Sequence, residues 1–66
     1  MSWRAGNKLF WETWPTVKDN IPDPEVRSEF TRGFLTLLLD MDADPSDFRD
    51  RDPEVDRLMD IIDPEL

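Results

Sequence analysis

Residues 24–41 read PEVRSEFTRGFLTLLLDM and form the strongest helical pattern in the chain. Asp23 before Pro24 marks the start of a helix. An aspartate at the N-cap accepts hydrogen bonds from free backbone N–H groups, and proline at the first helical position has no N–H to leave unpaired. Apolar positions then recur at the spacing of a core-facing helical stripe, namely Val26, Phe30, Gly33, Phe34, Leu37, Leu38 and Met41. This stretch therefore predicts a long helix at the centre of the fold.

Two leucines of the same helix lie outside that stripe. Leu35 and Leu39 are one turn apart on the opposite side, so residues 34–39 are apolar nearly all round the helix. A helix of this kind is central in its fold or lies in an interface. Gly33 costs about 1 kcal/mol relative to alanine in a helix interior, so we expect a neighbour to pack closely against it.

The preceding segment, residues 3–20, also carries an apolar stripe, made of Trp3, Phe10, Trp14, Val17 and Ile21. Pro15 interrupts it, because a proline inside a helix costs roughly 3 kcal/mol and removes the hydrogen bond to the carbonyl of Trp11. We expect the first helix to break or kink sharply at Pro15. The tryptophans are expected to pack as an aromatic core beneath the second helix. Alternatively Trp11, which lies outside the stripe, anchors an interface with a partner.

Two further Asp-Pro pairs, at Asp44 and Asp52, predict helix starts nearer the C-terminus. The first predicts a short helix over residues 45–49. The second predicts a helix over residues 53–62, which a fourth pair at Asp63 ends. The inward-facing residues of these segments are expected to be Phe48, Val55, Leu58, Met59 and Ile62.

Composition narrows the class of protein. The chain has 66 residues and no cysteine, so neither disulfides nor thiolate metal sites stabilise it. Histidine, the commonest general base, is absent too, and no catalytic or cofactor motif is present, so we expect neither an enzyme nor a cofactor. The patterns together predict an all-α fold. We expect a single domain over residues 1–66, a small bundle of three main helices plus one or two short ones.

Hydropathy and net charge limit the partners. No run of about 20 apolar residues exists to span a membrane, and the N-terminal segment lacks the apolar core of a signal peptide. We therefore expect a cytoplasmic protein that does not bind membranes. The net charge of −8 would repel nucleic acid as well as anionic lipid. A basic protein is the partner that this charge favours.

The acidic C-terminal half, residues 40–66, holds the whole of the excess charge. It contains eleven acidic and three basic residues, whereas residues 1–39 are neutral overall. Such segregation costs folding stability through repulsion, and solubility alone does not require it. Asp44 and Asp52 are also expected to be caps, while five acids have no evident local role: Asp40, Asp42, Asp50, Asp56 and Asp60. The candidate partner-binding residues are Asp40, Asp42, Asp44, Asp47, Asp50, Asp52, Glu54, Asp56, Asp60 and Asp63.

Residues 40–44, DMDAD, have the spacing that opens an EF-hand calcium loop. The rest of that loop does not follow. Its sixth position needs glycine and is Pro45, and its twelfth needs a bidentate glutamate and is Arg51. We therefore predict no metal site here.

A short, cysteine-free, strongly acidic helical chain with tryptophan-rich packing resembles the phage-encoded DNA-mimic inhibitors, among them anti-restriction and anti-CRISPR proteins. The resemblance lies in the ten candidate acids and covers less than half of the chain. It implies that the acidic half occupies a basic, nucleic-acid-binding surface of a partner protein. A rival hypothesis is an assembly module, which forms a homodimer or hetero-complex through residues 24–41. Its candidate apolar interface is Trp11, Leu35 and Leu39.

Overall fold

The computed structural model describes residues 4–65, and every regular element in that part of the chain is helical. The all-α prediction is confirmed, including the short helix before the last long one. Trp3, which we placed in the first apolar stripe, lies outside the described residues. The elements are α1 (Arg4–Asn20), α2 (Pro24–Asp40), the 3-10 helix η1 (Pro45–Phe48), α3 (Pro53–Ile62) and the 3-10 helix η2 (Asp63–Glu65).

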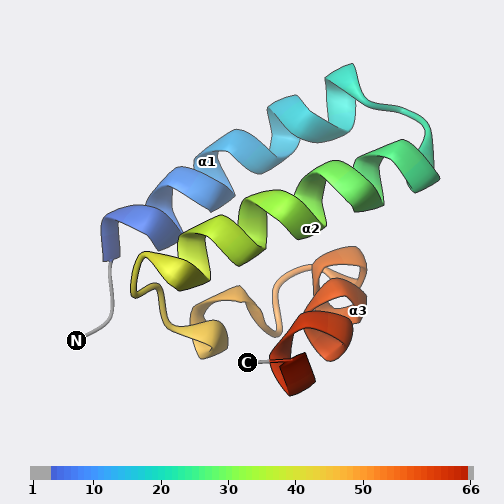
Figure 1. Ribbon diagram of the computed structural model, residues 1–66. Helices are drawn as coiled ribbons and strands as arrows, with labels where there is room; N and C mark the ends of the chain where they lie inside the picture. The colour runs from blue at the N-terminus through green and yellow to red at the C-terminus, as the bar shows by residue number, and fades with distance from the viewer. Residues whose placement is uncertain (1–3, 66) are drawn as a thin grey trace.

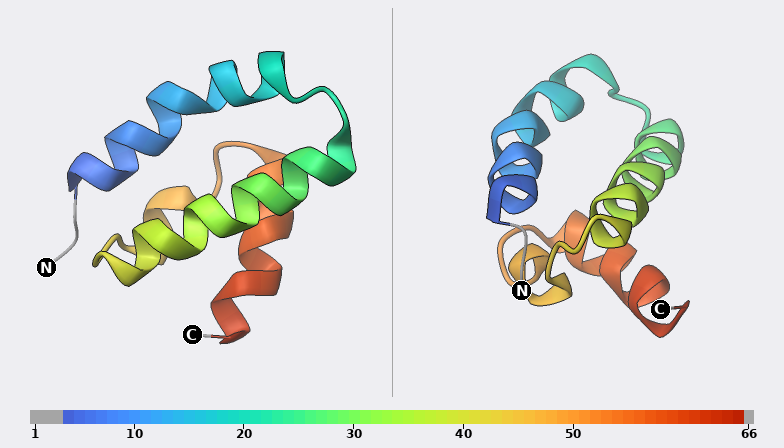
Figure 2. Two further views of the ribbon diagram at one scale, coloured as in Figure 1. Left: turned by 45° about the horizontal axis from the view of Figure 1, so that its top comes forward. Right: turned by 60° about the vertical axis from the view of Figure 1, so that its left-hand side comes forward.

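The first two long helices lie side by side and run in opposite directions, joined by residues 21–23 (Figure 1). The segment with η1 and α3 then packs across the same side of this pair, as both views of Figure 2 show. No helix within residues 4–65 is both long and apolar enough to cross a membrane.

Phe10 in α1 is the centre of the core and has no exposed surface. Its ring stacks on Trp14 at a centroid distance of 5.6 Å and meets Trp11, Phe34 and Phe48 at 4.9, 5.6 and 5.4 Å. These aromatic contacts join α1, α2 and η1, and aromatic pairs at such distances add to the free energy of burial. The aromatic core predicted beneath α2 is therefore present for the two tryptophans that are described.

Three aspartates begin helices as predicted. Asp23, Asp44 and Asp52 are N-caps, and each side chain accepts a hydrogen bond from the backbone N–H two residues on, before a proline-led first turn. The apolar face predicted for α3 is also confirmed, since its buried residues are Val55, Leu58, Met59 and Ile62.

The first helix is not broken at Pro15. α1 runs from Arg4 to Asn20 with the proline inside it, and it curves along its length (Figure 2). Pro15 is exposed, so the carbonyl of Trp11 that lacks a donor can be hydrated. Phe10, Trp14 and Val17 on the other side are buried, and their packing holds the helix together across the proline.

The predicted inward face of α2 is only partly right, since Leu38 is buried and Phe34 packs against the core but the other five residues of the stripe are exposed. Leu35, which we placed on the outer side, has no exposed surface, while Leu37 is 57% exposed. Gly33 is exposed, and a Cβ atom placed there would have no neighbour within 4 Å, so no other described residue packs against it. The buried face is instead formed by Thr31, Leu35 and Leu38. A pattern based on hydrophobicity could not predict this face, because Thr31, one of its three buried residues, is polar.

Candidate functional site

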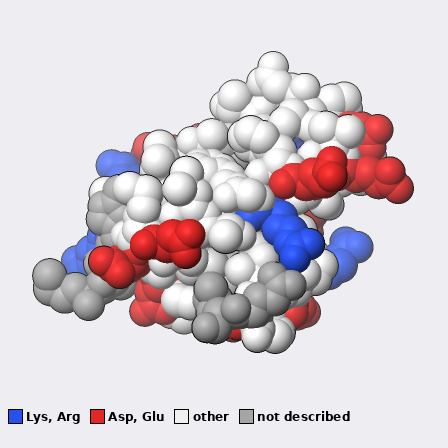
Figure 3. All heavy atoms as spheres, in the orientation of Figure 1, with Lys and Arg blue, Asp and Glu red and all other residues white. Residues whose placement is uncertain are grey.

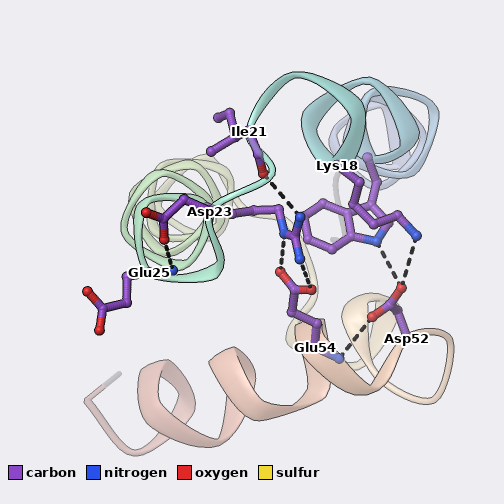
Figure 4. Close-up of polar contacts among 8 residues, drawn as sticks. Lys18, Ile21, Asp23, Glu25, Asp52 and Glu54 are labelled. Carbon is purple, nitrogen blue, oxygen red and sulfur yellow. Dashed lines mark hydrogen bonds and ion pairs between the residues drawn. The ribbon is translucent and has the colours of Figure 1, made fainter.

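Asp52, a candidate partner-binding residue, holds α1 to the start of α3. Its Oδ1 atom accepts a hydrogen bond from the backbone N–H of Glu54 at 2.8 Å. Its Oδ2 atom accepts from Trp14 Nε1 at 3.0 Å and lies 3.5 Å from Lys18 Nζ (Figure 4). Burial acts to raise the pKa of Asp52, but the hydrogen bonds from Trp14 and Glu54 and the charge of Lys18 outweigh it and lower the pKa. This carboxylate serves the fold.

Glu54 is also used inside the fold. Its two carboxylate oxygens accept from Arg27 Nε at 2.7 Å and Nη2 at 2.9 Å, and Arg27 Nη1 donates to the carbonyl of Ile21 at 3.1 Å. This bidentate pair ties α3 to α2 and to the connection before it (Figure 4). The hydrogen bond to Glu54 is the main reason that the pKa of Arg27 is raised.

Three more of the candidate acids have local partners. Arg49 Nη1 donates to Asp60 at 2.8 Å, and Arg49 Nη2 donates to Asp63 at 3.2 Å. Asp56 accepts from the backbone N–H of Asp50 at 2.9 Å. Our prediction that Asp56 and Asp60 lack a local role is therefore wrong. These side chains reach back across the turn before α3, which sequence spacing does not reveal.

The remaining candidates lie in residues 40–50, which we call the acidic turn. None of its five carboxylates forms an ion pair with a lysine or arginine among the described residues. Four of these side chains are exposed, and that of Asp47 is half-buried. The five are Asp40, Asp42, Asp44, Asp47 and Asp50.

The backbone of the acidic turn is well defined. Asp42 and Asp50 have φ angles of 71° and 68°, a left-handed conformation that aspartate tolerates better than most residues. Asp44 accepts from Ser46 N at 3.0 Å and Ser46 Oγ at 2.9 Å. The backbone hydrogen bond from Ser46 is the main cause of the lowered pKa of Asp44. Asp42 and Asp50 thus have a conformational role that we did not predict.

The predicted apolar interface does not form one exposed surface. Leu35 is fully buried, and Leu39 is half-buried against the core. Trp11 is half-buried and donates from Nε1 to the backbone carbonyl of Asp47 at 3.1 Å. The guanidinium carbon of Arg51 lies 5.3 Å from the centroid of the Trp11 ring, a cation–π contact. Trp11 therefore helps to hold the acidic turn in place.

Sequence reasoning missed a different apolar surface, the outer face of α2. It consists of Val26, Phe30, Gly33, Leu37 and Met41, which recur in steps of four, three, four and four. The four side chains are 52%, 50%, 57% and 49% exposed, in chain order. The pattern had already marked these residues as one stripe, but it assigned the stripe to the core.

A shallow hollow of about 300 Å³ lies between the N-terminal part of α2 and one side of α3. Glu54, one of its charged lining residues, is already bound by Arg27, and the hollow contains no nucleophile paired with a base. No group of three or more carboxylates among the described residues is arranged to hold a metal ion.

The acids seen on one face of the molecule form separate groups rather than one continuous strip. In Figure 3, uncharged surface and basic side chains lie between them. On this face a basic partner would therefore meet separate groups of carboxylates. Comparison of the chain with protein-family models, with curated proteins and with solved structures finds no match.

Proposed function

We propose that the protein binds a basic, nucleic-acid-binding surface of another protein and blocks it, as DNA-mimic inhibitors of the anti-restriction and anti-CRISPR kind do. The acidic turn makes the contact. The supporting observation is that its five carboxylates lie within eleven residues without a cationic partner in the described part of the chain. The protein acts by occupancy in the cytoplasm, with no catalytic residue, metal or cofactor.

Electrostatics favour such a complex. Each unpaired carboxylate that comes within 4 Å of a lysine or arginine gains about 1 kcal/mol in water, and more where the pair is desolvated. Long-range attraction also speeds the encounter. The turn is held by the Trp11 hydrogen bond and the Asp44 cap, so little conformational entropy remains to be lost on binding.

Neutralisation of the acidic turn tests this function. In the turn variant, Asp42, Asp47 and Asp50 become asparagine, which keeps the side-chain shape and tolerates the left-handed backbone of Asp42 and Asp50. The matched control changes Glu12 to glutamine and Asp19 and Asp23 to asparagine, and asparagine at position 23 preserves the cap. Both variants carry the same net charge.

Each protein is immobilised, incubated with a cell extract and eluted with duplex DNA, and the eluted proteins are identified by mass spectrometry. We expect nucleic-acid-binding proteins from the wild type and the control, and none from the turn variant. With a purified partner, affinity should fall steeply with salt, and less steeply for the turn variant. Equal capture by the turn variant would refute the proposal.

We infer a second candidate function, an assembly module, from the outer face of α2. Four large side chains about half exposed on one helix face are typical of a protein-binding surface. The interface differs from the one we predicted, since Leu35 is buried. Replacement of Leu37 by glutamate should abolish association through this face and leave the helical content unchanged. Unchanged association would exclude the face.

A further inference from the structure

The outer face of α2 contains a hole of the kind that receives a side chain from a neighbouring helix. Such a hole is bounded by residues i, i+3, i+4 and i+7, which here are Phe30, Gly33, Phe34 and Leu37. The rings of Phe30 and Phe34 lie 6.1 Å apart, and Phe34 is itself braced by Phe10 at 5.6 Å. A Cβ atom on Gly33 would have nothing within 4 Å. The hole is therefore open, with apolar walls and a glycine floor.

The structure reveals no role for Gly33 in the packing of the described residues. Glycine in a helix interior lowers stability by about 1 kcal/mol relative to alanine. It requires no positive φ here, and no side chain in residues 4–65 packs on it. A large side chain inserted from outside would use the space that the missing Cβ leaves.

The stripe around this hole is as long as a helix-binding surface needs to be. It extends from Val26 to Met41, which is about 22 Å along the helix axis at 1.5 Å per residue. Its steps of four, three, four and four match the anchor spacing of a partner helix of about four turns. The outer face of α2 therefore fits one amphipathic helix.

The charged residues beside the stripe indicate which kind of partner helix it binds. Successive residues turn by about 100° around the helix axis, so Glu25, Glu29 and Asp40 all fall beside one edge of the stripe. All three are exposed, and none forms an ion pair among residues 4–65. A second copy of the chain would bring the same acids and a further net charge of −8. Lysine or arginine beside the partner's apolar stripe would pair with them instead.

We propose that the outer face of α2 binds a basic amphipathic helix of a partner protein, which inserts an apolar side chain above Gly33 and places lysine or arginine beside Glu25, Glu29 and Asp40. We rest this inference on the second candidate function, in its hetero-complex form. It shares only Asp40 with the acidic turn, and the turn variant leaves Asp40 unchanged, so the two surfaces can be tested separately.

The test uses three synthetic 18-residue helical peptides as probes. The first has a leucine stripe with steps of four, three, four and four, bordered by lysine. The second replaces the lysines by glutamate, and the third keeps the lysines but scrambles the leucines. Titration into the ¹⁵N-labelled protein at 0.15 M salt should give saturable binding for the first peptide alone, with the largest shifts on the outer face of α2. No binding, or equal binding of the glutamate or scrambled peptide, would overturn the proposal.

Variants separate this surface from the acidic turn. Gly33→Ala should weaken binding of the first peptide about tenfold, because a methyl group fills the hole, although the protein itself becomes more stable. Glu29→Gln with Asp40→Asn should weaken it several-fold and reduce its salt dependence. The turn variant should bind like the wild type. If the turn variant loses peptide binding while the Gly33→Ala variant keeps it, the peptide occupies the acidic turn and the inference is wrong.

Sedimentation equilibrium completes the test with the full chain alone. We expect a monomer at all concentrations. A dimer that Leu37→Glu dissociates would identify a second copy as the occupant, which would overturn the present inference and leave the second candidate function standing.

Discussion

Replacement of Asp52 by alanine is expected to lower the free energy of unfolding by about 2 kcal/mol. Loss of an N-cap side chain, here bonded to the Glu54 N–H at 2.8 Å, typically costs about 1 kcal/mol. Trp14 is 3% exposed, so its Nε1 would lose its acceptor at 3.0 Å in a largely dry site, at a cost of about 1 kcal/mol more. The pair with Lys18 adds little, because the lysine side chain is 43% exposed.

Urea denaturation followed by far-ultraviolet circular dichroism measures this loss without relying on the fluorescence of Trp14, whose surroundings change in the variant. In thermal melting, the same loss of stability should lower the Tm by about 10 °C for a chain of this length. Asp52→Asn keeps the cap but has one carbonyl oxygen for two donors, so it should lose about half as much. Asp40→Ala, which removes an exposed carboxylate without a partner in the described residues, should change stability by less than about 0.5 kcal/mol.

A double-mutant cycle isolates the bond between α1 and α3. Trp14→Phe removes the Nε1 donor, so its combination with Asp52→Asn should show a coupling energy of about 1 kcal/mol. The reasoning is refuted if Asp52→Ala has the stability of the wild type, or if the asparagine and alanine variants are equally unstable. The first result would mean that neither the cap nor the Trp14 bond stabilises the fold, and the second would mean that the cap contributes nothing.

Thr31→Val should stabilise the protein by about 1 kcal/mol in urea denaturation, because the fully buried Oγ1 of Thr31 has no hydrogen-bond partner among the described residues. Gly33→Ala should raise the stability of the isolated protein by a similar amount, measured by thermal melting, and a lower Tm would contradict the open space at this position. Leu35→Ala should cost about 3 kcal/mol and Leu37→Ala less than about 1, and the reverse order would show that α2 is turned the other way. The lowered pKa of Asp52 contributes stability that is complete above its ordinary value of 3.8 and is lost as the pH falls through the folded-state value. The urea midpoint should therefore drop below about pH 4, less so in Asp52→Asn.

Local chemistry was enough to predict where the helices begin. The Asp-Pro pairs at Asp23, Asp44 and Asp52 mark three N-termini correctly, because a cap and its first turn involve only neighbouring residues. The inward face of α3 followed from spacing alone, since its apolar residues form a single stripe. α2 has apolar residues almost all round, so spacing allowed two overlapping faces, and the predicted stripe combined the core residues Phe34 and Leu38 with five exposed ones.

The role of each acid required the tertiary structure. Asp52 and Glu54 looked like members of one acidic surface, but their oxygens are taken by Trp14 and Arg27, which are 38 and 27 residues away. Composition could show that residues 40–66 carry the excess charge, but not which carboxylates remain without a cation.

Residue order therefore determined the helices, their starts and the total charge, all of which depend on groups a few positions apart. Only the packing of α1, α2 and α3 decided that Leu35 is buried, that Gly33 is open and that the acidic turn has no cationic partner in the described part of the chain. Those outcomes depend on which side chains, far apart in the sequence, lie within hydrogen-bond or van der Waals distance of one another in the folded chain. The spacing of residues along the sequence does not reveal these distances.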